Sequence, residues 1–342
     1  MNGTIEWICP SNIALVKYWG KRPVQLPLNP SISFTLSEAV TRMKIEYDYN
    51  KNKPFSMEFI FNGNPRPEFE QKLTGYLGRI RDFIPELEHT QFKINSANTF
   101  PHSAGIASSA SSFGGLALAL ACMKDEMRNE TGNSENFVRN ASLLARLGSG
   151  SACRSLYGGY VLWGSYEGIP GSSDEFAIPL PEINNEFLSL RDSILVVSSE
   201  PKQLSSSKGH QLMEQNVFTA GRRSQALNNL QRMLDSLREG DWTGFMTVME
   251  DEALSLHAML MTSSPGYILL KPGTLEIIEK IRNFRKREGI QAGFTLDAGP
   301  NVHMIYPQSA EAAISNLINN ELSIHCEHII HDKIGIGPER IR

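Results

Sequence analysis

The sequence predicts a mixed α/β fold of the α+β, two-layer type, divided into two domains. Its 342 residues are more than one hydrophobic core usually supports, and about 150 residues per domain gives about two domains. Patterns typical of strands open the chain and return in its second half, with helical patterns between them. We therefore expect an N-terminal domain over residues 1–185 and a C-terminal domain over residues 186–342.

The N-terminal half begins with strands and continues with helices. Alternating apolar residues predict strands at Thr4–Cys9, Ser31–Leu36 and Met43–Tyr47. Apolar residues at helical spacing predict a helix that includes Leu73, Leu77, Ile80 and Ile84. A second helix is predicted over Ser108–Met123, and because it is apolar nearly all round we expect it to be buried.

The second half follows a segment with the composition of a linker. Residues 179–181 are Pro-Leu-Pro, polar residues follow them, and the strand pattern resumes at Ser193–Val197. A helical stripe that ends at Gly240 is formed by Leu227, Leu230, Leu234 and Leu237. Thr274 is expected to cap a further helix, whose inward residues are Leu275, Ile278 and Ile281. Strands are predicted at Gly293–Leu296 and Asn301–Tyr306.

Composition and charge exclude several classes of protein. Lys and Arg total 33 against 37 Asp and Glu, a net charge of −4, so no overall field attracts nucleic acid. The longest nearly apolar stretch, Phe113–Met123, is shorter than the roughly 18–20 residues that cross a bilayer. The N-terminus lacks a secretory pattern, and the cysteines form neither a disulfide framework nor a CxxC pair: Cys9, Cys122, Cys153 and Cys326. We expect a cytoplasmic protein with no nucleic-acid or membrane partner.

A loop rich in Gly and Ser, residues 101–110, leads directly into the predicted buried helix. The start of a helix carries unpaired N–H groups and about half a positive charge, so this loop is a candidate phosphate cradle. The alternative is a serine cap on a core helix. It is not a Walker A loop, because the GxxxxGK[ST] pattern is missing from the sequence.

Two further segments gather cations. Residues 147–154 form a second Gly- and Ser-rich loop that ends at Arg154, and arginine binds carboxylate or phosphate with two parallel hydrogen bonds. Residues 12–22 place Lys17, Lys21 and Arg22 with two aromatic residues just after a strand. A plain turn and a solvated surface loop are the respective alternatives.

A single carboxylate completes the set. Asp297 lies at a strand end before a tight Gly-Pro turn, where it acts either as a turn cap or as a base. Residues 201–210 form another hydroxyl-rich turn, for which a solvated linker is the alternative. Taken together, three loops suited to anions, a cation cluster and one carboxylate indicate transfer of a phosphoryl group to an anionic substrate.

Two other clusters are weaker candidates. The residues His325, Cys326, His328 and His331 have metal-ligand side chains, but a strand alternating through Ile324 and Ile330 would divide them between opposite faces. We therefore expect no metal site there. The basic run of Arg282, Arg285, Lys286 and Arg287 is expected at a solvated helix end, where cations complement the helix dipole.

Four segments of the chain carry a family resemblance. They are SNIALVKYWGKR at 11–22, NTFPHSAGIASS at 98–109, GSGSACRSLYGGY at 148–160 and LDAGPN at 296–301. In this order they closely resemble the mevalonate diphosphate decarboxylases of the GHMP kinase superfamily. Because the segments are spread over most of the chain, local coincidence is a poor explanation for the match.

The resemblance implies both a fold and an activity. The fold is a GHMP kinase-like pair of domains, the first similar to domain 2 of ribosomal protein S5 and the second ferredoxin-like, with the active site in the cleft. The activity uses ATP and Mg²⁺ to phosphorylate the tertiary 3-hydroxyl of (R)-5-diphosphomevalonate, followed by loss of phosphate and CO₂ to give isopentenyl diphosphate in the mevalonate pathway. A cytoplasmic homodimer is also implied.

The resemblance also implies residue roles by matching position. Asp297 would orient or deprotonate the 3-hydroxyl with Lys17 beside it, and Arg154, held by Asn12, would bind the substrate carboxylate. The substrate would be bound by Tyr18, Trp19, Lys21, Ser149, Gly150, Ser151 and Arg154. ATP would be bound by Asn98, Gly105, Ala107, Ser108, Ser109 and Ser206, and no residue is assigned as a metal ligand.

Some alternatives stay open at this point. Pro23 follows Arg22 where a longer loop is usual, and His210 stands where Met is common, which leaves the number of phosphates preferred at C5 undecided. A phosphomevalonate decarboxylase or a mevalonate 3-kinase that stops at the phosphorylated product would bind the same carboxylate. A catalytically silent sensor of phosphate ligands is the alternative outside the enzymes, and the presence of Asp297 argues against it.

Overall fold

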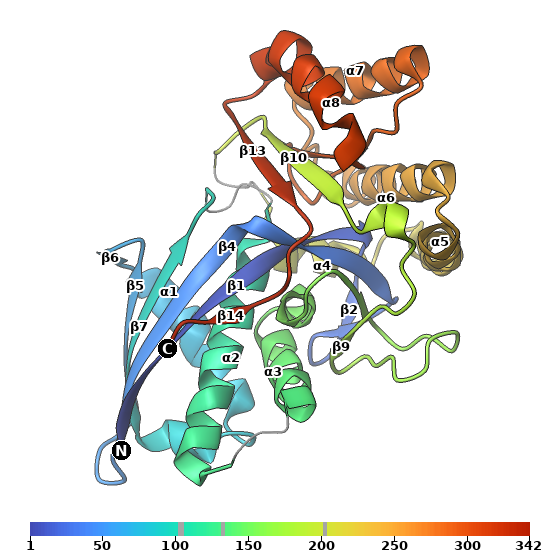
Figure 1. The fold of residues 1–342 in the computed structure, drawn as a ribbon. Helices are drawn as coiled ribbons and strands as arrows, with labels where there is room; N and C mark the ends of the chain where they lie inside the picture. Colours follow the sequence, from blue (N-terminus) through green and yellow to red (C-terminus); the bar gives the residue numbers. More distant parts are fainter. Residues whose placement is uncertain (102–105, 131–133, 201–203) are drawn as a thin grey trace.

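The computed structural model describes residues 1–101, 106–130, 134–200 and 204–342, and its strands form two main sheets (Figure 1). The larger sheet has the spatial order β14-β1-β4-β7-β5-β6, with β8 beside β4 and β9 beside β8. Its strands are β1 (Asn2–Val16), β4 (Ser31–Tyr49), β5 (Ser56–Phe61), β6 (Asn64–Pro65), β7 (Thr90–Asn98), β8 (Tyr160–Trp163), β9 (Ala177–Pro179) and β14 (Glu339–Arg340). A separate small hairpin pairs β2 (Lys21–Arg22) with β3 (Leu26–Pro27).

Three helices pack around one core on the larger sheet. They are α1 (Pro67–Ile80), α2 (Ser108–Arg128) and α3 (Ser134–Gly148). Ile5 and Ile45 of the strands share this core with Leu116 and Leu120 of α2. The expected buried helix is confirmed, since α2 is buried on nearly every side as far as Met123. Small residues permit this close packing from all directions.

The second sheet is antiparallel, with the spatial order β11-β12-β10-β13. Its strands are β10 (Leu190–Val196), β11 (Gly293–Thr295), β12 (Val302–Pro307) and β13 (His328–Lys333). The helices of this half are α4 (Ser206–Leu212), α5 (Thr219–Glu239), α6 (Trp242–Met261), α7 (Pro272–Glu288) and α8 (Glu311–Leu317). The chain order of strand, helices, two strands, helix and strand is that of a ferredoxin-like domain, as the resemblance implied. The predicted α/β class is confirmed.

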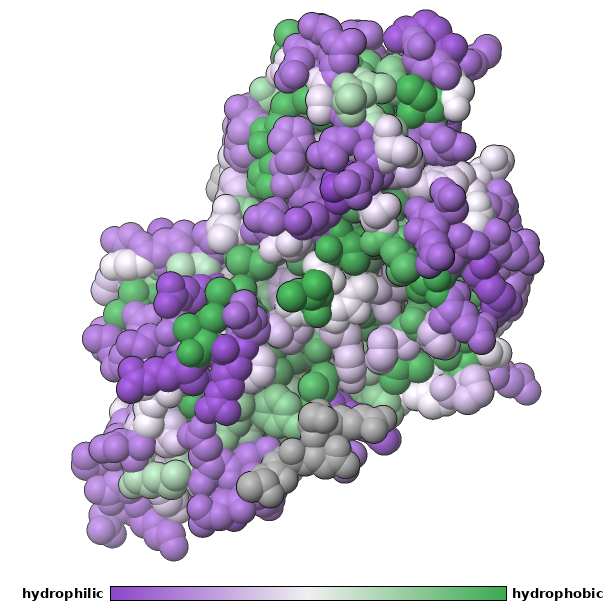
Figure 2. Space-filling model, in the orientation of Figure 1, coloured by the Kyte–Doolittle hydropathy of each residue, from purple (hydrophilic) through white to green (hydrophobic). Residues whose placement is uncertain are grey.

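The two halves share a hydrophobic core. Ile13 and Phe34 of the larger sheet pack in one cluster with Ile194 of β10 and Leu230 of α5. The last strand, β14, returns to pair with β1, so the end of the chain joins the first sheet. Figure 2 shows hydrophobic residues mainly along the middle of this face, with hydrophilic ones around them. The boundary near residue 185 stays a prediction.

Two of the predicted strands are one continuous strand. Ser31–Leu36 and Met43–Tyr47 both belong to β4, which stays extended between them. Pairing with β1 is interrupted by a register shift between Thr35 and Val40, where the amides of residues 37–39 donate to the carboxylate of Asp332 instead. The predicted strand at Thr4–Cys9 likewise runs on to Val16, because the C-terminal half covers its other face.

Four details of the helix predictions are wrong. Ile84 lies beyond α1, since the following Pro85 disfavours helical backbone before it. Leu227 of α5 and Leu275 of α7 are exposed, so the buried stripes run through Leu230 and Ile278 instead. The cap of α7 is Lys271, and Thr274 lies in its first turn, where its hydroxyl accepts from the Lys271 amide. Gly240 ends α5 in a left-handed conformation, as predicted.

The cluster of His and Cys side chains also differs from its prediction. The strand β13 begins only at His328, and a short 3₁₀ turn over Ser323–His325 precedes Cys326, so no single strand carries the cluster. Within the described ranges, no group of three or more His, Cys, Asp or Glu side chains is placed to hold a metal ion. No helix in those ranges is long and apolar enough to cross a membrane.

The basic run at the end of α7 is only partly solvated. Arg285 and Arg282 both bind the buried carboxylate of Glu250 on α6, at 2.6 Å and 3.3 Å between nitrogen and oxygen. Arg287 pairs with Glu288 at the surface. The prediction of a fully solvated helix end is therefore wrong for Arg285, because α6 supplies a buried acidic partner that the local sequence does not show.

Candidate active site

A cavity of about 400 Å³ lies between the two halves of the molecule. The end of β1, the start of α2 and the 3₁₀ helix η2 (Gly150–Leu156) bound it on one side, and α4, α6 and the segment after β11 bound it on the other. The sequence-predicted residues that line it are Asn12, Lys17, Tyr18, Trp19, Lys21, Ala107, Ser108, Ser109, Ser149, Gly150, Ser151, Arg154 and Asp297. The tertiary fold thus gathers four separate segments around one space.

The other three predicted residues do not contribute to the described lining of the cavity. Asn98 ends β7 and accepts a hydrogen bond from the Thr41 hydroxyl at 2.9 Å, which is a structural contact. Gly105 lies outside the described residues. Ser206 is the first residue of α4, its side chain lies outside the description, and its neighbours Ser205 and Ser207 line the cavity.

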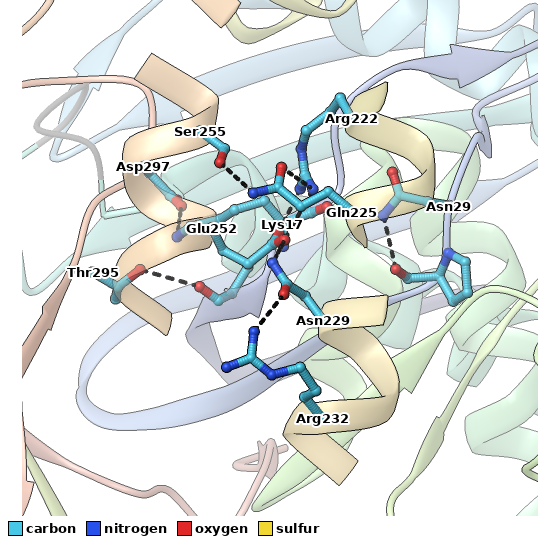
Figure 3. A network of polar contacts seen from close by, with 12 residues as sticks. Lys17, Asn29, Arg222, Gln225, Asn229, Arg232, Glu252, Ser255, Thr295 and Asp297 are labelled. Carbon is cyan, nitrogen blue, oxygen red and sulfur yellow. Dashed lines mark hydrogen bonds and ion pairs between the residues drawn. The ribbon is translucent and has the colours of Figure 1, made fainter. Parts of the chain in front are cut away.

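Lys17 and Asp297 form an ion pair in the cavity wall (Figure 3). Lys17 follows the last residue of β1, and its Nζ atom lies 3.0 Å from Oδ1 of Asp297, two residues after β11. The Lys17 side chain is 2% exposed and that of Asp297 is 26% exposed, so the carboxylate faces the cavity. Burial lowers the pKa of Lys17, while the negative charge of Asp297 opposes that shift.

Arg154 is a buried cation held by neutral groups. Its Nε atom donates to Oδ1 of Asn12 at 3.3 Å, and its guanidinium also donates to the Ser31 hydroxyl. Asn12 is fixed in turn by its bond to the Ser155 hydroxyl at 2.8 Å. Within the described part of the chain, no ion pair involves Arg154, although the residue is only 3% exposed. A buried guanidinium whose hydrogen-bond partners are neutral is stabilised by an anionic ligand.

The loop that carries Gly150 lies against Tyr18. A Cβ atom at residue 150 would lie 2.7 Å from the Trp163 ring and 2.9 Å from the Tyr18 hydroxyl, so only glycine fits here. Tyr18 packs edge-on against Trp163, with ring centroids 4.6 Å apart. The Tyr18 hydroxyl is buried and has no hydrogen-bond partner among the described residues. It is therefore available to a ligand of the cavity.

The start of α2 adds hydroxyl groups and a partial positive charge to the cavity. The Ser108 hydroxyl is buried without a partner among the described residues. The Ser109 hydroxyl lies 3.2 Å from that of Ser149, which links α2 to the second small-residue loop. Ala107 precedes the helix with a φ of 46°, a left-handed conformation that is uncommon outside glycine. This end of the cavity is suited to phosphate groups.

Sequence reasoning missed Lys72. It lies on α1, lines the cavity, and its Nζ atom is 5.3 Å from the centre of the Phe113 ring. Partial burial lowers its pKa. The residue is the polar neighbour of Leu73 in an amphipathic helix, a position that the sequence alone assigns to solvent. In the sequence, only the charge of Lys72 could have indicated that it lines an anion-binding cavity.

His210 is a second residue whose contacts were missed. Its Nδ1 atom accepts a hydrogen bond from the Gly20 amide at 2.9 Å. Its ring lies against both Tyr18 and Trp19, with centroids 4.4 Å and 4.9 Å away. Burial, and to a smaller extent the charge of Lys21, lower the pKa of His210 to about 3. The imidazole is therefore neutral and holds the Gly20 turn against α4.

Cations predominate in the cavity wall. Among the described lining residues, Asp297 is the only carboxylate, whereas Lys17, Lys21, Lys72 and Arg154 are cationic. Such a wall attracts a ligand with several negative charges and offers Asp297 as a group that can accept a proton. This combination is suited to phosphoryl transfer to an anionic substrate.

This fold, with a cationic cavity at the junction of its halves, is that of the GHMP kinase superfamily. Two family models identify the family within this superfamily. Residues 9–176 match the diphosphomevalonate decarboxylase-like N-terminal domain, and residues 193–335 match the mevalonate 5-diphosphate decarboxylase C-terminal domain. The chain belongs to the diphosphomevalonate decarboxylase family.

Individual relatives match over nearly the whole chain. The diphosphomevalonate decarboxylase of Debaryomyces hansenii is 32% identical over 328 residues, which is 90% of this chain and 81% of the relative. That of Bos taurus is 31% identical over 313 residues, 85% of this chain and 74% of the relative. The relatives carry the same name across fungi and a mammal.

Solved structures of the family are also similar to this chain over its whole length. The mevalonate diphosphate decarboxylase of Staphylococcus aureus has a TM-score of 0.84 at 29% identity and covers 100% of this chain and 99% of its own. A structure described as MDDEF in complex with MVAPP, AMPPCP and magnesium has a TM-score of 0.84 at 28% identity and covers 100% of both chains.

Proposed function

We propose that this chain catalyses the ATP-dependent decarboxylation of (R)-5-diphosphomevalonate to isopentenyl diphosphate, ADP, phosphate and CO₂. Membership of the diphosphomevalonate decarboxylase family supports this assignment. The observation that carries it is the buried Arg154, a guanidinium with no ion pair in the described residues, beside the pair of Lys17 and Asp297. The substrate carboxylate is the anion that Arg154 is expected to bind.

The first chemical step needs a base. A tertiary alcohol is a poor nucleophile, and a positioned carboxylate lowers the barrier to its attack on a phosphoryl group. Asp297 takes this role as the one carboxylate among the described lining residues, and its contact with Lys17 orients it. The hydroxyl proton goes to Asp297, and the 3-oxygen forms a bond to the γ-phosphorus of ATP. The bond from that phosphorus to the oxygen bridging to the β-phosphate breaks, and ADP leaves with the bonding electrons.

The second step breaks two bonds of the phosphorylated substrate. The C3–O bond breaks, phosphate leaves with the bonding electrons, and positive charge develops at C3. The bond between the carboxylate carbon and its neighbour then supplies the electron pair of the new double bond, and CO₂ is released. Arg154 holds the carboxylate in place, and the cationic wall stabilises the leaving phosphate.

The residues at the start of α2 fit the phosphates of ATP. The buried, unpartnered hydroxyl of Ser108 and the adjacent Ser109 are available as donors there. Mg²⁺ in such sites is bound by substrate phosphates and only one or two protein groups. Since the described residues hold no cluster of three acidic or imidazole ligands, we expect the metal to arrive with ATP, where it neutralises phosphate charge.

We assign the C5 diphosphate to a second set of polar residues in the cavity wall. Lys21, Tyr18 and Ser151 line the cavity and are the residues that we assign to this group, and the Lys21 ammonium can exchange its contact with Gln25, now 3.0 Å away, for a phosphate oxygen. We also propose that the enzyme acts as a homodimer in the cytoplasm, as the family resemblance implies. Light scattering of the purified protein would measure the oligomeric state.

The test measures all products together. The purified chain is incubated with ATP, Mg²⁺ and (R)-5-diphosphomevalonate, and ADP, phosphate, CO₂ and isopentenyl diphosphate are quantified. We expect one of each per substrate consumed. Formation of ADP with a stable 3-phosphorylated product and without CO₂ would contradict the proposal and indicate a kinase.

Two variants test the residue roles in this assay. Asp297→Asn should fold and bind ATP but lose roughly 10²–10⁴ in kcat, because the base is removed. Arg154→Gln should lose activity with ATP affinity nearly unchanged, since its partner is the substrate carboxylate. If Asp297→Asn keeps wild-type turnover at saturating substrate concentrations, Asp297 is a turn cap and the assigned role is wrong.

A further inference from the structure

A fully buried glutamate lies behind the cavity wall. Glu252 is on α6 and its side chain is 0% exposed. Its Oε2 atom accepts a hydrogen bond at 2.8 Å from the backbone amide of Lys17, the residue whose side chain binds Asp297 (Figure 3). The glutamate does not line the cavity, so it acts through Lys17 rather than on a ligand.

Helix α5 holds this glutamate in place. Arg222 donates to Oε1 of Glu252 at 2.9 Å and to Oε2 at 2.5 Å. Asn229, two turns along the same helix, donates to Oε1 at 2.8 Å. Both Arg222 and Asn229 are buried. With four donors around two oxygens, the carboxylate has one defined position.

A buried ion pair is a poor way to stabilise a fold. Removing two charges from water is costly, and apolar residues of similar volume often serve equally well or better. The pair of Glu252 and Arg222 instead delivers a fixed acceptor to one backbone amide, at the first residue after β1. The buried pair of Glu252 and Arg222 is explained if fixing the position of Lys17 is more important than the free energy that burying the pair costs.

The same helix also contacts the other half of the catalytic pair. The Nε2 atom of His257 lies 3.1 Å from the backbone oxygen of Asp297 and must donate, because a carbonyl can only accept. His257 is 1% exposed. Leu256, the residue before it, lines the cavity. Helix α6 therefore binds the backbone of both Lys17 and Asp297, which come from opposite halves of the chain.

We propose that α6 aligns the catalytic pair, with Glu252 and His257 as positioning residues that set the separation of Lys17 and Asp297. This inference deepens the proposed function and rests on it. Neither residue touches the substrate. Their effect is to bring a lysine from β1 and a carboxylate from the loop after β11 into one geometry before any ligand binds. Such pre-organisation is most valuable where charge develops during the reaction.

The charge of Glu252 also acts on Lys17. The groups that influence the Lys17 ammonium are Asp297 after β11, Glu252 on α6, Arg154 on η2 and Asp192 on β10. Glu252 opposes the lowering of the Lys17 pKa that burial causes, whereas Arg154 adds to it. Loss of the glutamate charge should therefore lower the Lys17 pKa further, and the ammonium would lose its proton at a lower pH.

The test compares two changes at Glu252 with a matched control. Glu252→Gln removes the charge, and Glu252→Asp keeps the charge but withdraws the acceptor from the Lys17 amide. Glu250→Gln is the control, because Glu250 is also a buried acidic residue of α6 bound to arginines, but on the side away from the cavity. The measurements are kcat, the KM of each substrate, and the pH profile of kcat.

We expect kcat to fall by about 10²-fold in Glu252→Gln, with little change in either KM. The alkaline limb of its pH profile should move to lower pH. Glu252→Asp should also lose kcat but keep the wild-type pH profile, while Glu250→Gln should match the wild type in both. Wild-type kcat in Glu252→Gln, or an equal loss in Glu250→Gln, would overturn the proposal.

Two outcomes need separate treatment. If Glu252→Gln does not fold, Asn229→Ala removes one donor to the carboxylate without changing charge and should lower kcat by a smaller factor. An unchanged kcat in both Asn229→Ala and Glu252→Asp then overturns the proposal. Absence of CO₂ release from the wild-type chain would instead contradict the proposed function, and the two failures are thereby distinguished.

Discussion

At the scale of single residues, the site depends on two buried cations. Lys17 and Arg154 are almost fully enclosed, and only Lys17 forms an ion pair within the described residues. Burying an ammonium or guanidinium is costly unless polar groups surround it. The hydroxyl and amide groups around Arg154 solvate it in part, and the substrate anion supplies the rest. The free enzyme therefore already has the charge that its ligand requires.

His210 gives a prediction at this scale. Its pKa is about 3 in the folded protein, because burial disfavours the charged ring, and about 6.5 in an unfolded chain. Between these values the unfolded state binds the proton and the folded state does not. The free energy of unfolding should therefore decrease as pH falls from about 6.5 towards 3, by up to about 1.4 kcal/mol per pH unit from this residue.

Denaturant titrations at several pH values in this window would measure the effect. Replacing the ring by a side chain that does not titrate, in His210→Met or His210→Gln, should flatten the pH dependence of stability. Both replacements should do so despite their different polarity. A slope equal to that of the wild type in both variants would show that His210 is protonated or exposed in the folded protein.

At the scale of elements, the position of η2 depends on one glycine. The 3₁₀ helix η2 presents Arg154 to the cavity, and its first residue, Gly150, lies against Tyr18 and Trp163. An added methyl group would lie 2.7 Å from the Trp163 ring and 2.9 Å from the Tyr18 hydroxyl, so one of these side chains or the loop must move. Overpacking of this kind costs about 1–3 kcal/mol.

We expect Gly150→Ala to weaken substrate binding more than ATP binding. Displacement of Tyr18 and of the loop should raise the KM for 5-diphosphomevalonate by about tenfold, which corresponds to about 1.4 kcal/mol. Gly78→Ala is the control, since a methyl group on that helical residue of α1 meets no atom within 4 Å. Kinetics of the control should match the wild type. An equal rise of both KM values in Gly150→Ala would contradict the assignment of this loop to the substrate alone.

At the scale of the whole molecule, the two halves are joined by a shared core and a shared site. The cluster that contains Phe34 and Leu230 crosses between the sheets, and the Thr295 hydroxyl donates to the Ala14 carbonyl at 3.5 Å across the same junction. The ligands of the cavity would touch both halves. Unfolding of one half would therefore expose core residues of the other.

We expect one cooperative unfolding transition. Calorimetry should show a single peak that moves to higher temperature with 5-diphosphomevalonate, since a ligand at 100 times its Kd adds about 2.7 kcal/mol of stability. Two resolved peaks, of which the ligand moves only one, would contradict this and would show that the halves fold independently.

Much of the site could be predicted because its residues lie in compact segments. Local patterns were sufficient for the buried helix α2, and the segments singled out in the sequence, among them the loops that carry Ser149 and Arg154, do line one cavity. The roles that the family resemblance implies for these residues stay predictions. The chemistry of these side chains is a property of the residues themselves. Hydrophobic periodicity is also local, so the α/β class and most elements followed from the sequence alone.

Long-range contacts were decided only by the tertiary structure. No local pattern pairs Glu252 with the Lys17 amide, 235 residues away in the chain, or shows that His210 packs against Tyr18. The same reason explains the errors at β4 and at Arg285, where bonds to Asp332 of β13 or to Glu250 of α6 outweighed the local pattern. Burial and partners depend on which elements pack together, and the packing of distant segments is a property of the whole chain.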